Sequence, residues 1–249
     1  MTRQIRSELL KLRTTRTTLG LVLGMGALVV FTVVIQLVAS QFEDSGIPRI
    51  EERDTQRTIF ATASTAGLFA VLIGIMSVTG EFRHGTIRPT LLFAPARAAL
   101  VVAKGVACAL AGALLAVAAV ALTFGIAGAW LEVDDVEQSL GRSDLLAIAA
   151  GTVAATVLWA VIGVGAGAVV RNQVAAILAT ILWTSVPEPL LMALVPNVGR
   201  FAPGVAADAV SGAPGQEMLS PLASAAVLAL WALAFVVAGS VVMARRDVP

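Results

Sequence analysis

The sequence predicts an all-α, polytopic membrane protein with six transmembrane helices. Its 249 residues are 58% hydrophobic and 13% charged, whereas an ordinary soluble domain carries about 25% charged residues. Six apolar runs, each about the length that a helix needs to cross ~30 Å of hydrocarbon, alternate with short charged segments. Transmembrane strands need only about half that length, so we interpret the runs as helices. The runs lie at about 19–39, 59–79, 99–130, 145–170, 174–194 and 221–243.

These runs occupy most of the chain, so residues 1–249 are predicted to form a single membrane domain. The segments between them are too short to fold as a separate unit of ~50 residues. Two pairs of glycines, Gly20 with Gly24 and Gly163 with Gly167, have the small-x-x-x-small spacing that lets helices approach closely. We therefore expect close helix packing within the bundle.

The basic residues are distributed unevenly between the connecting segments. Twelve of the 17 Lys and Arg residues fall in residues 1–18, 80–104, 171–173 and 244–249, and the other five fall in the alternate segments. Connections rich in Lys and Arg stay on the cytoplasmic side of a membrane. Both termini are therefore expected in the cytoplasm.

A short amphipathic helix is predicted before the first run. Ile5, Leu9 and Leu12 recur at helical spacing among basic residues, which is typical of a helix lying in the inner membrane interface. A solvated basic tail is the simpler alternative. Cleavage as a signal peptide is disfavoured, because the following run of ~20 residues is longer than a usual signal core and five more runs follow it.

Ionisable residues are rare in the six runs. Lys104 lies about five residues into the third run, where its ammonium is expected to extend to the inner surface, and Glu188 lies near the outer end of the fifth. The single His84 and single Cys108 are too far apart in the sequence to suggest a zinc site. The sequence contains no phosphate-binding loop, zinc-protease motif or nucleophile elbow. We therefore expect a noncatalytic protein without a metal or cofactor, and we disfavour an intramembrane enzyme or an ion-driven transporter.

The segment between the second and third runs has the most specific pattern. Gly85 permits a sharp turn, Thr86 can cap a short helix, and Pro95 would end that helix after about two turns. Its apolar side would consist of Ile87, Leu91 and Leu92, and its charged margin of Arg83, His84 and Arg88. An inner loop resting on lipid headgroups is the alternative.

Two sequence patterns flank the first two runs. The N-terminal pattern is Ser7-Glu8-Leu9-Leu10-Lys11-Leu12, and the second is Glu81-Phe82-Arg83-His84-Gly85-Thr86-Ile87-Arg88 followed by Leu91-Leu92 and Pro95-x-Arg97. Together they resemble the permease subunits of ABC-2 type exporters. The resemblance extends over the whole chain, because that family also has six spans, both termini inside and a proline-rich stretch before the last span, here residues 187–221.

The resemblance implies a noncatalytic subunit that forms the substrate path of an ATP-driven exporter in the bacterial plasma membrane. Its partners would be separate ABC ATPase subunits, a second permease that is either identical or different, and the lipid bilayer, with no nucleic acid. In the family, a short cytoplasmic helix after the second span docks on the ATPase. This assigns ATPase coupling to Glu81, Arg83, His84, Gly85, Thr86, Ile87, Arg88, Leu91 and Leu92. The second and fifth spans would line the route, and residues 187–221 would form a re-entrant outer segment. The sequence does not identify the cargo. The alternative function is a membrane anchor or sensor subunit that transports nothing.

Overall fold

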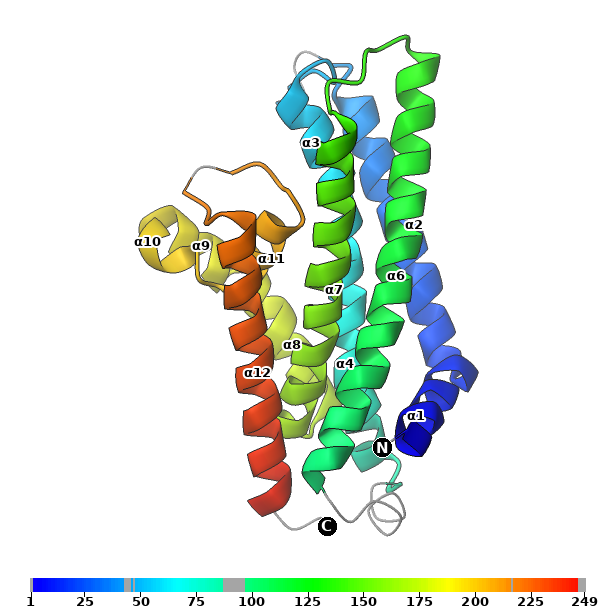
Figure 1. Cartoon of the computed structure of the whole chain (residues 1–249), viewed down its shortest axis with the longest axis vertical. Helices are drawn as coiled ribbons and strands as arrows, with labels where there is room; N and C mark the ends of the chain where they lie inside the picture. Colours follow the sequence, from blue (N-terminus) through cyan, green and yellow to red (C-terminus); the bar gives the residue numbers. More distant parts are fainter. Residues whose placement is uncertain (1, 43–45, 47, 87–96, 216, 246–249) are drawn as a thin grey trace.

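The computed structural model describes the chain except for residues 1, 43–45, 47, 87–96, 216 and 246–249. The described residues form helices and their connections, with no strand among them. Six helical segments are long and apolar enough to cross a membrane, which confirms the predicted number and indicates a multi-pass membrane protein. Figure 1 shows them as an elongated bundle in which the start of the first helix and the end of the last helix lie at one end, which we call the terminal end.

The helices in chain order are α1 (Thr2–Thr14), α2 (Arg16–Ala39), α3 (Arg53–Ala61), the 3-10 turn η2 (Thr62–Thr65), α4 (Ala66–Arg83), α6 (Arg97–Val133), α7 (Arg142–Val170), α8 (Gln173–Ser185), α9 (Pro187–Leu194), α10 (Pro196–Gly199), α11 (Pro203–Val210) and α12 (Pro221–Arg245). Most spans extend a few residues past the predicted apolar runs. The reason is that backbone hydrogen bonding continues into the polar ends, where the hydrophobic signal has already stopped.

Two of the six spans are composite. The second runs from Arg53 to Arg83 through α3, η2 and α4. The fifth is interrupted between α8 and α9 at Val186, which has φ −124° and ψ −64° and precedes Pro187. Proline lacks a backbone N–H and restricts the residue before it, so the chain changes direction there. The short helices α9 to α11 then form a lobe beside the main bundle (Figure 1).

The helices α4 and α7 form the most extensive contact between elements of the described chain, and glycine lets them approach closely. A methyl group added to Gly167 would lie 2.8 Å from the carbonyl oxygen of Ile75, and one added to Gly163 would collide with the backbone of Val71. By contrast, no heavy atom lies within 4 Å of the position that a methyl group would take on Gly20. The predicted close packing is therefore confirmed for the pair on α7 and not for Gly20 on α2.

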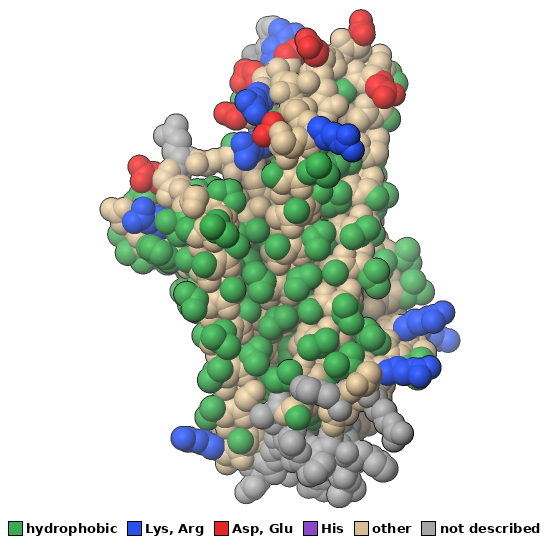
Figure 2. Space-filling view, viewed as in Figure 1, with side chains coloured by type: hydrophobic (Ala, Val, Ile, Leu, Met, Phe, Trp, Pro, Cys, Tyr) green, Lys and Arg blue, Asp and Glu red, His purple; other side chains and the backbone are tan. Residues whose placement is uncertain are grey.

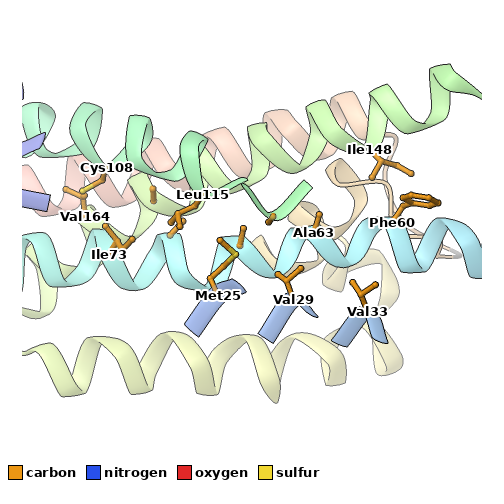
Figure 3. Close-up of a cluster of buried hydrophobic side chains, with 14 of the residues drawn as sticks. Met25, Val29, Val33, Phe60, Ala63, Ile73, Cys108, Leu115, Ile148 and Val164 are labelled. Carbon is orange, nitrogen blue, oxygen red and sulfur yellow. The ribbon is translucent and has the colours of Figure 1, made fainter. Parts of the chain in front are cut away.

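The apolar core lies between α2, α4, α6 and α7. Helix α2 contributes Met25, Val29 and Val33 at four-residue spacing, and these side chains face the buried cluster that contains Leu115 and Val164 (Figure 3). The outer surface is apolar as well. Figure 2 shows hydrophobic side chains over the middle of the visible face, with charged side chains toward its ends. This distribution suits a bundle surrounded by lipid.

Candidate functional site

The predicted loop begins where α4 ends, at the terminal end of the bundle. The N–H of Thr86 donates to the carbonyl of Glu81 at 3.0 Å, and the N–H of Gly85 donates to that of Phe82 at 3.3 Å. Gly85 has φ +67°, a conformation that glycine adopts without steric cost. The predicted sharp turn at Gly85 is thus confirmed. Because residues 87–96 lie outside the described part of the chain, the short helix predicted there remains a prediction.

The structure separates the predicted coupling residues into two groups and leaves four undescribed. Glu81 is buried, whereas Arg83, His84, Gly85 and Thr86 are exposed at the end of the bundle. Ile87, Arg88, Leu91 and Leu92 lie outside the described residues.

Glu81 belongs to an ionic cluster that joins three helices. We define this cluster as Glu8 and Lys11 of α1, Glu81 of α4 and Lys104 of α6. The Nζ of Lys104 lies 2.7 Å from Oε2 of Glu8 and 2.8 Å from Oε1 of Glu81, and it also donates to the carbonyl of Ser77 at 3.0 Å. The Nζ of Lys11 lies 2.7 Å from Glu8 and 2.8 Å from Glu81. Two ammonium groups therefore share two carboxylates, and the formal charges cancel.

Three charged groups of the cluster are almost completely buried. Lys104 is 2% exposed, Glu8 6% and Glu81 8%, so their charges have lost most of their water. Burial alone would raise the pKa of Glu8, but the ammonium groups of Lys104 and Lys11 offset it and hold that pKa below its usual value. Similarly, burial alone would lower the pKa of Lys11, whereas hydrogen bonds to Glu8 and Glu81 raise it above its usual value. The folded structure thus favours the charged form of both groups.

The prediction that Lys104 extends to the inner surface is wrong. Its ammonium points instead at Glu8 and Glu81, which lie on helices far from it in the sequence. The composition contained a partial signal, since Glu8 and Glu81 are acidic residues in otherwise basic segments. Their spatial proximity depends on how α1 folds back against α6, and no local pattern encodes that.

A cavity of about 520 Å³ borders the ionic cluster, with Glu8, Lys11 and Glu81 in its wall. Its wall includes Thr15 and Thr18 from the start of the first span and Ser77, Arg83 and His84 from the end of the second. Nearby, the guanidinium of Arg171 lies over the ring of Phe82 at 5.1 Å and donates to the carbonyl of Val242 at 3.0 Å. These contacts connect the ends of α4, α7 and α12 beside the loop.

The ion pairs of the cluster connect α1, α4 and α6 at the terminal end of the bundle. Among the described residues, no group of three or more His, Cys, Asp or Glu side chains could hold a metal ion. A scan of protein-family models finds none that matches the chain, and a search of curated proteins finds no match either. The functional conclusion therefore depends on the sequence patterns and on the geometry of this site.

Proposed function

We propose that the chain is the permease subunit of an ATP-driven ABC-2 type exporter, with both termini on the cytoplasmic side of a bacterial plasma membrane. The observation that supports this proposal is the ionic cluster. It connects α1 and α6 to the last turn of α4, directly before the loop in which the ATPase-docking helix is expected. A loop that receives force needs such a rigid attachment to the transmembrane helices.

In this proposal, the energy enters from outside the chain. ATP binding brings two separate ATPase subunits together, and the helix predicted within residues 87–96 moves with them. Separating the buried ammonium of Lys104 from its carboxylates would leave uncompensated charge, at a cost of about 3–5 kcal/mol. The ends of α1, α4 and α6 therefore move together, and the motion passes into the bundle instead of being absorbed at the loop.

The proposed transporter requires a second permease, which is either identical or different. The fifth span has the least buried surface of the six, with 11% of its most apolar window buried within the chain, so it has room for a partner or for lipid. The lobe formed by α9 to α11 would be the re-entrant outer segment. Irregular backbone at membrane depth is stable only where protein covers it or where it borders a polar cavity.

The test begins with the tagged chain, purified in mild detergent from cells that naturally produce it. We expect an ATPase with a phosphate-binding loop to co-purify, and we expect the chain alone to bind and hydrolyse no ATP. The purified ATPase should rebind inside-out vesicles that contain the chain and should not rebind right-side-out vesicles. ATP hydrolysis by the isolated chain would contradict the proposal, and an absence of any ATPase partner would favour the anchor or sensor function.

A substitution in the loop makes this test specific. Leu91→Asp should reduce ATPase retention at least ~10-fold, because the sequence predicts Leu91 on the apolar face of the docking helix and a buried unpaired charge weakens binding by at least ~1.4 kcal/mol. Val133→Asp, the same chemical change at an exposed position on the end of α6 away from the termini, is the matched control. Both variants should insert normally. Full retention by Leu91→Asp would instead favour the alternative interpretation, in which the loop is a connection that rests on lipid headgroups.

A further inference from the structure

A second cavity of about 520 Å³ lies on the other side of the membrane core from the ionic cluster, bordered by α4, α7, α8, α9 and α11. Carboxylates of Glu188 and Asp208 contribute to its wall, together with hydroxyl groups of Thr180, Thr184 and Ser211. No Lys, Arg or His is among the described residues that form this wall. Arg57 approaches the region, but its Nε donates to the carbonyl of Gly212 at 2.8 Å and its side chain is not part of the wall. The cavity is therefore acidic without a balancing cation.

Glu188 is the more buried of the two acidic residues in this wall. It is 2% exposed, and its Oε2 accepts the N–H of Gly204, in the first turn of α11, at 2.7 Å. Its Oε1 is also buried and has no hydrogen-bond partner in the described part of the chain. The Val205 amide and the Trp183 indole lie nearby, but neither meets the geometry of a hydrogen bond to Oε1.

Capping of α11 explains only one of the two carboxylate oxygens. The hydroxyl of Ser211, fully buried in the same wall, also has no partner among the described residues. Asp208 contributes a second carboxyl group to the same wall. Buried polar groups are normally paired, and the repulsion between two carboxylates in one wall is relieved by a proton or by a bound cation. The unsatisfied groups thus point to a positively charged, hydrogen-bonding ligand.

An apolar cavity of about 330 Å³ adjoins the acidic one. The two share Trp159, Thr180 and Thr184 as common wall residues. The apolar cavity is also bordered by Trp183, Trp231 and Phe235. Aromatic rings provide a large hydrophobic surface, and their faces attract cations. A ligand that occupies both cavities would therefore need a charged part and a hydrophobic part.

From this pair of cavities, we infer a binding site for an amphipathic organic cation, with its protonated amine between Glu188 and Asp208 and its hydrophobic body among the aromatic side chains. An ammonium group offers three donors, which suits the free Oε1 of Glu188 and the neighbouring hydroxyls. The cavity volumes fall in the range of small-molecule sites, ~300–1,000 Å³. A bare metal ion fits less well, because no cluster of three acidic, His or Cys ligands exists among the described residues. As a cargo class, this inference rests on the proposed exporter function, but binding itself requires no ATPase.

The test uses the full chain in lipid nanodiscs and isothermal titration calorimetry, with empty nanodiscs subtracted. The probe is 1-naphthylmethylamine, and 1-naphthylmethanol is its uncharged counterpart. We expect the amine to bind at least ~10-fold more tightly than the alcohol, because the alcohol lacks the charge that the carboxylates complement. Glu188→Gln and Asp208→Asn should each weaken amine binding at least ~5-fold and leave alcohol binding unchanged. Glu217→Gln, an exposed acidic position outside both cavities, should change binding by less than ~2-fold.

Several outcomes would overturn the inference. Equal binding of the amine and the alcohol would show that the carboxylates do not recognise charge, and unchanged amine binding by both cavity variants would place the probe elsewhere. Displacement of the amine by millimolar Na⁺ or Mg²⁺ at constant ionic strength would assign the cavity to an inorganic ion. Asp208→Asn alters an exposed side chain, so it remains informative if Glu188→Gln fails to fold. Loss of amine binding with intact ATPase retention would reject this site alone, whereas amine binding without any ATPase partner would reject the exporter and keep the site.

Discussion

The ionic cluster at the terminal end and the acidic cavity near α11 both bury carboxylates, but they differ in how the charge is compensated. Glu8 and Glu81 each contact two ammonium groups within 2.8 Å. Among the described residues, Glu188 has one backbone N–H partner, and Asp208 contributes a second carboxyl group to the same cavity wall. Each region leaves one buried carboxylate oxygen without a hydrogen-bond partner among the described residues, Oε2 of Glu81 and Oε1 of Glu188, and each borders a cavity. The difference is that the carboxylates of the first region contact ammonium groups, whereas no Lys, Arg or His is among the described residues in the cavity wall around Glu188.

This difference separates a structural role from a binding role. A neutral set of ion pairs fixes helices relative to one another, because any member that leaves exposes the others. A carboxylate without a cation can instead form an ion pair with a positively charged ligand. If this comparison is correct, substitutions in the two regions should affect stability very differently.

The largest effect is expected at Lys104. Lys104→Met keeps much of the side-chain volume but leaves Glu8 and Glu81 to share Lys11, so the free energy of unfolding should fall by about 3–5 kcal/mol. Equilibrium unfolding in mixed micelles with increasing sodium dodecyl sulfate would measure it. Arg53→Met, which removes the exposed pair of Arg53 with Asp144, is the control and should cost less than about 1 kcal/mol. Similar losses in the two variants would mean that the buried cluster is not a rigid connection.

An intermediate effect is expected in the α4–α7 contact, which runs between the two regions. Gly163→Ala would force its methyl group against the backbone of Val71, so α7 and α4 must separate at a cost of about 1–3 kcal/mol. The same unfolding assay would report this loss. Gly20→Ala places a methyl group in open space and should not destabilise the protein, since alanine favours a helix over glycine. Equal tolerance of both changes would argue against the close α4–α7 packing.

The smallest effect on stability is expected at Glu188. Glu188→Gln keeps an acceptor for the N–H of Gly204 and removes a charge that has no cation, so the free energy of unfolding should change by less than about 1 kcal/mol. The comparison is made with Lys104→Met in the same micelles. A loss as large as that of Lys104→Met would show that Glu188 is a structural group in the way that Glu8 and Glu81 are.

The sequence by itself determined the helical class, the six spans and the turn at Gly85. Each depends on local information. Runs of apolar residues must match the bilayer thickness, and Gly85 readily adopts the left-handed conformation that ends α4. The basic asymmetry also predicts an orientation, which remains a prediction, as does the docking helix within residues 87–96.

Only the tertiary structure decided which buried charges have partners. Lys104 is separated from Glu81 by 23 residues and from Glu8 by 96, so its environment depends on the packing of α1 and α4 against α6. Gly20 and Gly163 begin the same sequence spacing, yet only Gly163 meets another helix closely. Likewise, the free oxygen of Glu188 results from the fold of α9 and α11 back toward α7. Local patterns determine how favourably each helix sits in the membrane. The contacts that define the two sites form between segments that are distant in the sequence, and the local pattern does not say which of these segments meet.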